Sequence, residues 1–195
     1  MGASMSGPSV AEFIEAIWGN GDALIELRCF SDGGEKKKPL QYWYTPEELA
    51  RKVEPIAEWA MRQRIGVFAG VLPRKRVGGS TSADTVPARV VWADVDFKDY
   101  KGGESEARER LEAFHKPSAI VRSGNGLHAY WLLNTERDPE LLSTGCRMIA
   151  GHLGADMAST DPARVLRLPG TYNAKKPEPK AVEVEVTRNW CGGPH

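Results

Sequence analysis

The chain has 195 residues, of which 41% are hydrophobic and 27% are charged, as in ordinary globular domains. Lys plus Arg and Asp plus Glu each number 26, so the formal net charge is zero and a general basic field for nucleic acid is excluded. No apolar stretch approaches the ~20 residues that span a bilayer, and the start does not resemble a signal peptide, so we expect no membrane partner.

The cysteines and the length give two further expectations. Cys29, Cys146 and Cys191 are far apart and odd in number, which fits neither a zinc site nor a disulfide framework. We therefore expect a cytoplasmic protein with reduced thiols. The length suits a single domain over residues 1–195, or two tightly fused modules that share a core.

Apolar spacing and turn residues divide the first part of the chain into alternating helices and strands. In order, these patterns predict a helix over 10–17, a strand over 23–30, a charged loop over 31–39, a helix from 45, a strand over 65–72 and a polar loop over 73–87. The helix that starts at Thr45 has a capping box and a first-turn proline, and Pro55 should kink or break it. Arg74 lies in the polar loop, where it could contact nucleic-acid backbone or remain solvated.

An apolar strand pattern over 90–97 ends in two carboxylates. In a strand, Asp94 and Asp96 point to the same side, ~7 Å apart along the chain. Adjacent anions repel unless a cation lies between them, and Mg²⁺ prefers carboxylate oxygens together with water and substrate phosphates. The pair therefore indicates metal-assisted phosphate chemistry, with a solvated acidic turn near Asp99 as the alternative.

The remaining patterns interleave helices and strands. They predict a crossover helix around 107–114, strands over 118–122 and 127–133, a helix over 138–153 that stops at Gly154, and a strand over 182–186. Interleaved elements of this kind are typical of an α/β or α+β fold around mixed sheets.

The turn between the two middle strands reads Ser123-Gly124-Asn125-Gly126, and His128 follows it. Glycines let a backbone approach a phosphate closely, and consecutive N–H groups in a turn can form an anion-binding nest. A histidine beside such a nest can bind a triphosphate oxygen. An ordinary hairpin whose histidine is satisfied by a neighbour is an equally simple reading.

A third cluster runs from Asp161 to Lys175 and contains Arg164 and Arg167. The planar fork of arginine suits phosphate oxygens, and lysine adds a point charge. A helix cap followed by solvent-facing arginines is the alternative. The chain contains no serine nucleophile elbow, H-E-x-x-H, Walker loop or Rossmann fingerprint that would indicate another chemistry.

The ordered set Asp94-Val95-Asp96, then 123–128, then 161–173, resembles the archaeo-eukaryotic primase superfamily. The similarity covers roughly residues 65–176, and it is strongest to the primase-polymerases of plasmids, phages and CRISPR-associated operons. That superfamily has a D-x-D or D-x-E pair on one strand, an S-x-H-like hairpin and a later acidic residue. The ordered trio is specific, although each part alone is not.

The resemblance implies an archaeo-eukaryotic primase core, in which an N-terminal α/β unit is fused to an RRM-like unit with mixed sheets. The approximate boundaries are 8–88 and 89–188, with the active site between the units. It further implies that Asp94, Asp96 and Asp161 hold two Mg²⁺ or Mn²⁺ ions. Asp156 lies in the same interval as the third carboxylate, and Asp161 is preferred because it adjoins the arginine run.

The resemblance also implies a nucleoside triphosphate substrate, dNTP or NTP, bound beside the glycine turn. The residues expected to bind it are Ser123, Gly124, Asn125, Gly126 and His128, with Arg164, Arg167 and Lys175 as contacts to phosphate or template.

We therefore expect a DNA primase-polymerase, a template-dependent nucleotidyltransferase that uses a two-metal mechanism. Its partners would be a single-stranded DNA template, a primer and nucleotides, and in a longer protein or complex a helicase or CRISPR adaptation proteins. The alternatives are a non-catalytic single-strand DNA-binding module of a replication initiator and a metal-dependent nuclease.

Overall fold

The computed structural model describes residues 9–19, 21–32 and 38–186. Its helices are α1 (Val10–Trp18), α2 (Pro46–Gln63), α3 (Gly103–Phe114) and α4 (Pro139–Leu153), with short 3₁₀ helices η1 (Ser82–Asp84), η2 (Phe97–Asp99) and η3 (Met157–Thr160). Its strands are β1 (Ile25–Ser31), β2 (Leu40–Tyr44), β3 (Ile65–Gly70), β4 (Ala88–Asp96), β5 (Ala119–Arg122), β6 (Gly126–Arg137), β7 (Val165–Arg167), β8 (Tyr172–Asn173), β9 (Lys180–Ala181) and β10 (Glu183–Val186).

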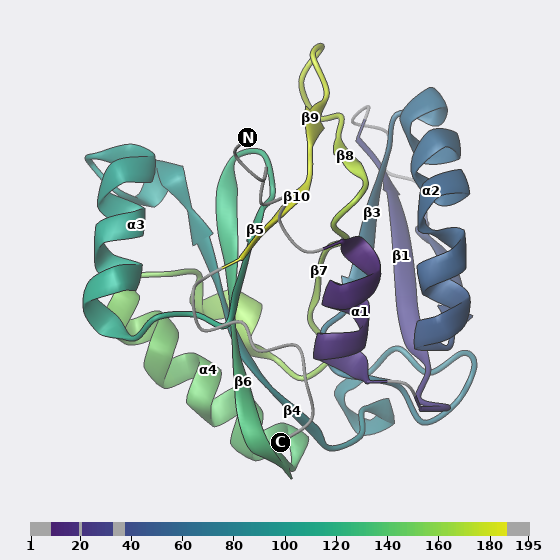
Figure 1. Cartoon of the computed structure of the whole chain (residues 1–195), viewed down its shortest axis with the longest axis horizontal. Helices are drawn as coiled ribbons and strands as arrows, with labels where there is room; N and C mark the ends of the chain where they lie inside the picture. Colours follow the sequence, from purple (N-terminus) through teal and green to yellow (C-terminus); the bar gives the residue numbers. More distant parts are fainter. Residues whose placement is uncertain (1–8, 20, 33–37, 187–195) are drawn as a thin grey trace, which may run out of the picture.

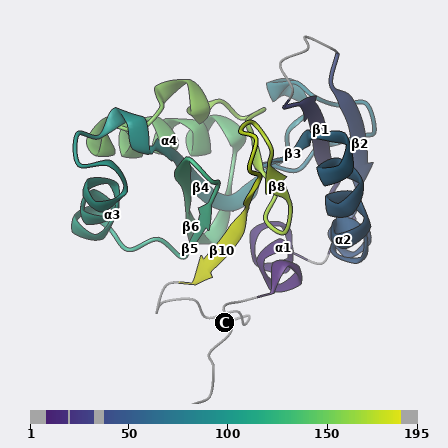
Figure 2. The same cartoon turned by 90° about the horizontal axis from the view of Figure 1, so that it is seen from above.

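The described strands form two four-stranded sheets and one small ribbon. The first sheet has the order β2-β1-β3-β7, the second has the order β10-β5-β6-β4, and β8 pairs with β9. In Figures 1 and 2 the two sheets stand side by side with α1 between them, and α3 and α4 cover the outer face of the second sheet. Among the described residues no helix is long and apolar enough to cross a membrane.

Helix α1 joins the cores of the two sheets. Phe13 and Ile17 pack into the hydrophobic cluster of the second sheet, whereas Ile14 packs with the first sheet and α2. The Phe13 ring meets the Tyr130 ring of β6 edge to face, with 5.4 Å between centroids. Because neighbouring residues of one short helix are buried in both clusters, the helix fixes the spacing of the sheets.

The second sheet contains a split β-α-β unit, the arrangement of RRM-like folds. Helix α3 crosses from β4 to β5, and β6 then returns between these two strands, antiparallel to both. This confirms the predicted α+β class. All the described strand pairs are antiparallel, so the sheets are not the mixed sheets that were expected. In the second sheet β4 and β5 run in the same direction, but β6 lies between them.

Helix α2 does not break at Pro55, which was one of the two expected outcomes there. Helix α2 has the predicted capping box at Thr45, but it continues through Pro55 to Gln63. Proline removes one backbone hydrogen bond, while Val53 and Ala57 on either side of it keep their burial in the core. The predicted boundary between two units at residue 88 stays a prediction. Strand β7 comes late in the chain, but it pairs with β3 in the first sheet.

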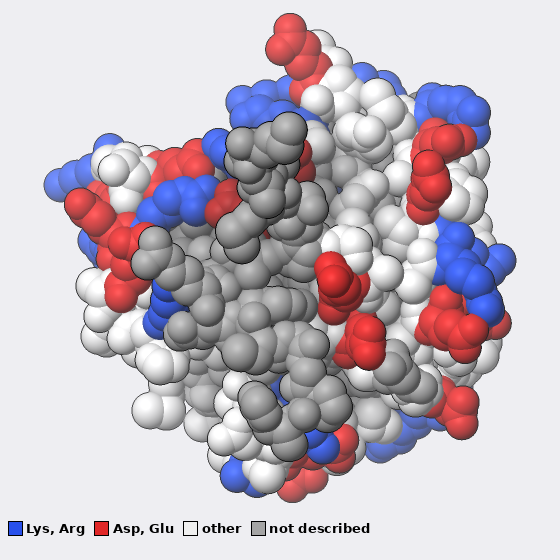
Figure 3. Space-filling model, in the orientation of Figure 1, with Lys and Arg blue, Asp and Glu red and all other residues white. Residues whose placement is uncertain are grey.

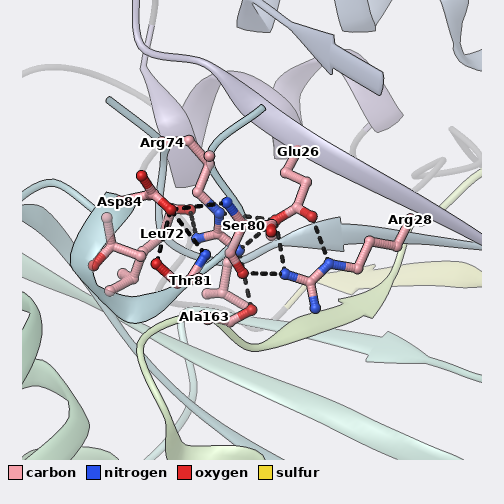
Figure 4. Close-up of polar contacts among 12 residues, drawn as sticks. Glu26, Arg28, Leu72, Arg74, Ser80, Thr81, Asp84 and Ala163 are labelled. Carbon is pink, nitrogen blue, oxygen red and sulfur yellow. Dashed lines mark hydrogen bonds and ion pairs between the residues drawn. The ribbon is translucent and has the colours of Figure 1, made fainter. Parts of the chain in front are cut away.

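A buried ion pair joins the first sheet to the loops beside it (Figure 4). Glu26 and Arg74 are 0% and 2% exposed, and their side chains are 2.9 Å apart. Arg28 pairs with the same carboxylate and donates to the Ser80 carbonyl, while Arg74 donates to the Ala163 carbonyl at 3.0 Å. The cluster therefore ties β1 to the β3–β4 loop and to the segment before β7.

The three basic residues of the β3–β4 loop have partners within the protein. Arg74 is buried, the Lys75 ammonium donates to the Ala83 carbonyl, and Arg76 pairs with Asp84 at 3.1 Å. Arg74 therefore stabilises the fold and is not placed to contact nucleic-acid backbone.

Replacing Glu26 with Gln should lower the free energy of unfolding by about 3–5 kcal/mol, because Arg74 would remain buried without its counter-charge. The exposed pair of Glu47 and Arg51 provides the control, and Glu47→Gln should cost less than about 1 kcal/mol. Urea denaturation of both variants measures the difference. Equal values would contradict the importance of the buried pair.

The same pair predicts acid sensitivity. Burial raises the pKa of Glu26, but hydrogen bonds from Arg28, Gln41 and Arg74 outweigh it and leave that pKa below its ordinary 4.5. The stabilisation is therefore complete above pH 4.5 and is lost as the pH falls through the lowered pKa. Glu26→Gln should show a shallower loss of stability over this range than the unmodified protein, and identical slopes would contradict the linkage.

Candidate active site

The pairing of β4 with β6 brings two of the predicted clusters together. In this register Asp94 lies opposite His128, and Asp96 lies opposite Gly126. Directly opposed residues on one face of an antiparallel pair are neighbours. The Asp94 Oδ1 atom is accordingly 3.6 Å from the His128 Nε2 atom.

Gly126 allows the strands to approach at this point. A Cβ atom added to it would lie 2.4 Å from the Val95 carbonyl oxygen, well inside contact distance. The Phe97 N–H donates to the Asn125 carbonyl at 3.2 Å, which continues the pairing past the end of the strand. Asn125 itself is exposed.

The turn before β6 is held by residues from the third cluster and beyond. The Ser123 hydroxyl donates to the Gly126 carbonyl at 3.1 Å, so it stabilises the turn itself. Gly124 has a φ of +96°. The Asn173 side chain donates to the Ser123 carbonyl at 2.9 Å, and the Lys180 ammonium donates to the Gly124 carbonyl at 3.0 Å.

His128 is a buried imidazole with unused hydrogen-bonding capacity. Its side chain is 5% exposed, and its Nδ1 atom is buried without a hydrogen-bond partner. Burial lowers the pKa of His128, Asp94 opposes that effect, and the positive charge of Arg167 adds to it. The net lowering favours the neutral ring at neutral pH.

Asp156 lies beside Asp94. Its backbone N–H donates to the Asp94 carbonyl at 3.0 Å. The Ser159 hydroxyl is 2.7 Å from Asp156 Oδ2 and 3.2 Å from Asp94 Oδ2, so it lies between the two carboxylates. The Trp92 indole donates to the Ser159 carbonyl at 2.7 Å and fixes η3 against β4.

Asp161, the preferred third carboxylate, makes different contacts. It forms an ion pair with Arg164 at 3.2 Å and is about half exposed. Arg164 also donates to the Ala158 carbonyl. The ion pair and hydrogen bonds described for Asp161 are thus local to its own loop, although its charge also acts on buried Arg74, whereas the hydrogen bonds of Asp156 reach Asp94.

The two other predicted cations differ in exposure. Arg167 is buried, with Asp32 as its ion-pair partner at 3.3 Å and the Phe68 ring 4.6 Å below its guanidinium. Lys175 is exposed, and its backbone N–H donates to Asn173. Figure 3 shows acidic and basic side chains interspersed over one face of the protein, in keeping with the zero net charge.

The donor set suits a hard divalent ion, although the side chains do not yet surround one. In the ranges that the structure describes, no group of three or more His, Cys, Asp or Glu side chains is close enough to hold a metal as it stands. Asp96 is instead paired with the Lys98 ammonium at 2.7 Å, and Lys98 is 75% exposed. Asp94, Asp96 and Asp156 all offer carboxylate oxygens, the ligands that Mg²⁺ prefers.

Sequence reasoning missed two residues of this region. Ser159 is a small polar residue in the short helix η3, and Asp32 is 135 positions from its partner Arg167, so no local pattern marks either. Asp156 was recognised as an alternative, but the neighbouring arginines favoured Asp161.

No family model matches the chain. An uncharacterized protein of Methanocaldococcus jannaschii is 34% identical over 143 residues, which cover 66% of this chain and 11% of that protein. The chain thus spans about a tenth of the length of this relative.

Solved structures are similar over nearly the whole chain. The AEP domain of the cyanophage S-2L primase-polymerase has a TM-score of 0.69 at 18% identity, covering 94% of this chain and 90% of that one. Primase RepB′ has a TM-score of 0.64 at 14% identity, covering 92% and 57%. The catalytic domain of RepB′ in complex with initiator DNA has a TM-score of 0.61 at 13% identity, covering 94% and 86%. At such identities the likeness establishes the fold.

Substituting Gly126 with Ala should destabilise the protein by at least about 1–3 kcal/mol, since the methyl group would force β4 and β6 apart. Gly151 in α4 is the control, because a Cβ there meets nothing within 4 Å. Gly151→Ala should be neutral or stabilising, as alanine favours the helix. Chemical denaturation compares the two, and a harmless Gly126→Ala would refute the close approach.

Proposed function

We propose, from a fold shared with the archaeo-eukaryotic primase superfamily, that this chain is a template-dependent nucleotidyltransferase. The shared fold confirms the predicted resemblance at the level of architecture. The finer proposal is a DNA primase-polymerase that joins nucleotides on a single-stranded template. The observation that supports it most is the β4–β6 register, which sets Asp94 beside His128 with Asp156 adjacent.

Asp94, Asp96 and Asp156 are the proposed ligands for Mg²⁺ or Mn²⁺. We assign the third position to Asp156 rather than Asp161, because Asp156 shares Ser159 with Asp94 while Asp161 pairs with Arg164. Bound divalent ions would neutralise triphosphate charge and activate the attacking hydroxyl. Lys98 supplies the positive charge beside Asp96 in the structure, and its exposure lets it withdraw.

The other residues would bind and orient the triphosphate. Burial lowers the pKa of His128, which favours the neutral ring, and the ring lies close to the glycine turn, so it suits a hydrogen bond to a phosphate oxygen. Arg167 would add a fixed guanidinium. Ser123 shapes the turn, because its hydroxyl is bonded within it. The remaining two cations, exposed Lys175 and half-buried Arg164, are the proposed contacts to the template strand.

DNA is the proposed polymeric partner. One of the similar catalytic domains was solved in complex with initiator DNA, which supports this choice. Because the chain carries no net charge, template affinity should depend on a few local phosphate contacts and weaken with salt. The helicase, CRISPR adaptation partners and cytoplasmic location stay predictions.

The first test removes the carboxylates of β4. Asp94→Asn and Asp96→Asn should each reduce nucleotide incorporation by more than about 100-fold with unchanged thermal melting, because a metal ligand is lost. The control is Asp99→Asn, an exposed carboxylate on η2, which should retain activity. The measurement is extension of a labelled primer–template with dNTPs and Mn²⁺ or Mg²⁺.

The same assay separates the alternatives. Shortening of the primer would indicate a nuclease. DNA binding that is indifferent to divalent ions, with no change in primer length, would indicate a binding module. Full extension by Asp94→Asn would refute the assignment.

The second test compares the two candidates for the third carboxylate. Asp156→Asn should lose more than about 100-fold in incorporation, and Asp161→Asn should stay within about threefold of the unmodified protein. Asparagine can still accept the Ala158 N–H that caps η3, so Asp156→Asn should remain folded. The opposite ranking would return the role to Asp161.

A further inference from the structure

Arg167 is enclosed at the inner side of the first sheet. Its Nη2 atom is 3.3 Å from Asp32 Oδ1, and its Nη1 atom is 3.5 Å from Asp32 Oδ2. The Nη1 atom also donates to the Tyr172 carbonyl at 3.4 Å. The guanidinium carbon lies over the Phe68 ring, 4.6 Å from its centroid, and this contact further restricts the fork.

Asp32 is itself anchored at two points. Its Oδ2 atom accepts the Ala174 N–H at 2.9 Å, and its own backbone N–H donates to the Arg64 carbonyl at 2.9 Å. Asp32 therefore joins the end of β1 to the segment that follows β8. An acceptor held in this way defines where the guanidinium lies.

Gly66 leaves the room that this pair needs. A Cβ atom at Gly66 would lie 2.8 Å from both Arg167 Nη1 and Asp32 Oδ1. Phe30, opposite Gly66 on β1, packs edge to face on Phe68 at 5.3 Å. The space is therefore shaped by β1 and β3 for one ion pair.

The pair is linked to the glycine turn through the segment 172–173. The Tyr172 carbonyl that Arg167 contacts precedes Asn173, whose side chain holds Ser123 in the turn. Arg167 is also close enough to His128 for its charge to lower the pKa of that ring. A guanidinium has five N–H donors, and the bonds described for Arg167 number three, so donors remain for a phosphate.

We infer that Asp32 is a positioning residue that aims Arg167 at the triphosphate of the incoming nucleotide. This inference rests on the proposed function, because the anion is the substrate of that site. Asp32 makes no contact with the nucleotide in this scheme. It acts by holding the fork of Arg167 in one orientation, so that little freedom is lost on binding.

The test is a comparison of KM and kcat for dNTP. Asp32→Asn keeps an acceptor for the Ala174 N–H but loses the charge that orients Arg167. It should raise the KM for dNTP about tenfold and change kcat less than threefold, as expected when substrate binding is weakened. The control is Glu185→Gln, which breaks a half-buried ion pair between Glu185 of β10 and Arg108 of α3. This change should leave both constants unchanged.

A double substitution tests whether Asp32 acts through Arg167. Arg167→Lys alone should raise the KM, and adding Asp32→Asn should raise it no further, because the fork is already lost. Additive effects, or an unchanged KM in folded Asp32→Asn, would overturn the inference. If Asp32→Asn does not fold, Asp32→Glu carries the test, since one added methylene displaces the fork while retaining the charge.

Failure of the inference is distinguishable from failure of the proposed function. Equilibrium binding of dNTP in the presence of Mn²⁺, measured by calorimetry, should be about tenfold weaker for Asp32→Asn. If the unmodified protein extends primers and both proteins bind dNTP equally, only the role of Asp32 is wrong. If the unmodified protein neither binds dNTP nor extends primers, the proposed function itself is wrong and the inference falls with it.

Discussion

The pairing of β4 with β6 is the constraint on which the candidate site depends. Side chains alternate along a strand, so a slip of one residue would turn Asp94 and Asp96 to the face that α3 and α4 cover and separate them from His128. Gly126 permits this register because any side chain there would collide with the backbone of β4. The position of Asp156 follows from the same strand, since its backbone bonds to Asp94.

The second determinant is the joining of the two sheets. Helix α1 is buried in both cores, and the Glu26–Arg74 pair holds the loops that lead into β4 and β7 (Figures 1 and 4). Strand β7 then carries Arg167 into the first sheet, while Asn173 reaches the turn before β6. The short segment from Arg167 to Asn173 thus contributes both to the first sheet and to the turn before β6, on the two sides of the candidate site.

Local sequence patterns predicted much of this arrangement, and they failed where contacts between residues distant in the sequence determine the structure. The carboxylate pair, the glycine turn and the capping box at Thr45 are short-range features, and the structure contains them. Strands β2 and β7 were missed because a three- or five-residue strand is stabilised mainly by its pairing partners. The partner of Arg167 was missed because Asp32 lies in another part of the chain, and the helix does not break at Pro55 because tertiary packing retains it.

The central claim is that Asp94, Asp96 and Asp156 converge on divalent ions beside a triphosphate held by His128 and Arg167. A crystal structure with Mn²⁺ and a non-hydrolysable dNTP tests it most directly, because anomalous scattering locates the ions. The account predicts manganese between these three carboxylates, Lys98 withdrawn from Asp96, and the triphosphate against the turn at 123–126. Manganese bound at Asp161 alone, or a nucleotide bound away from His128, would contradict it.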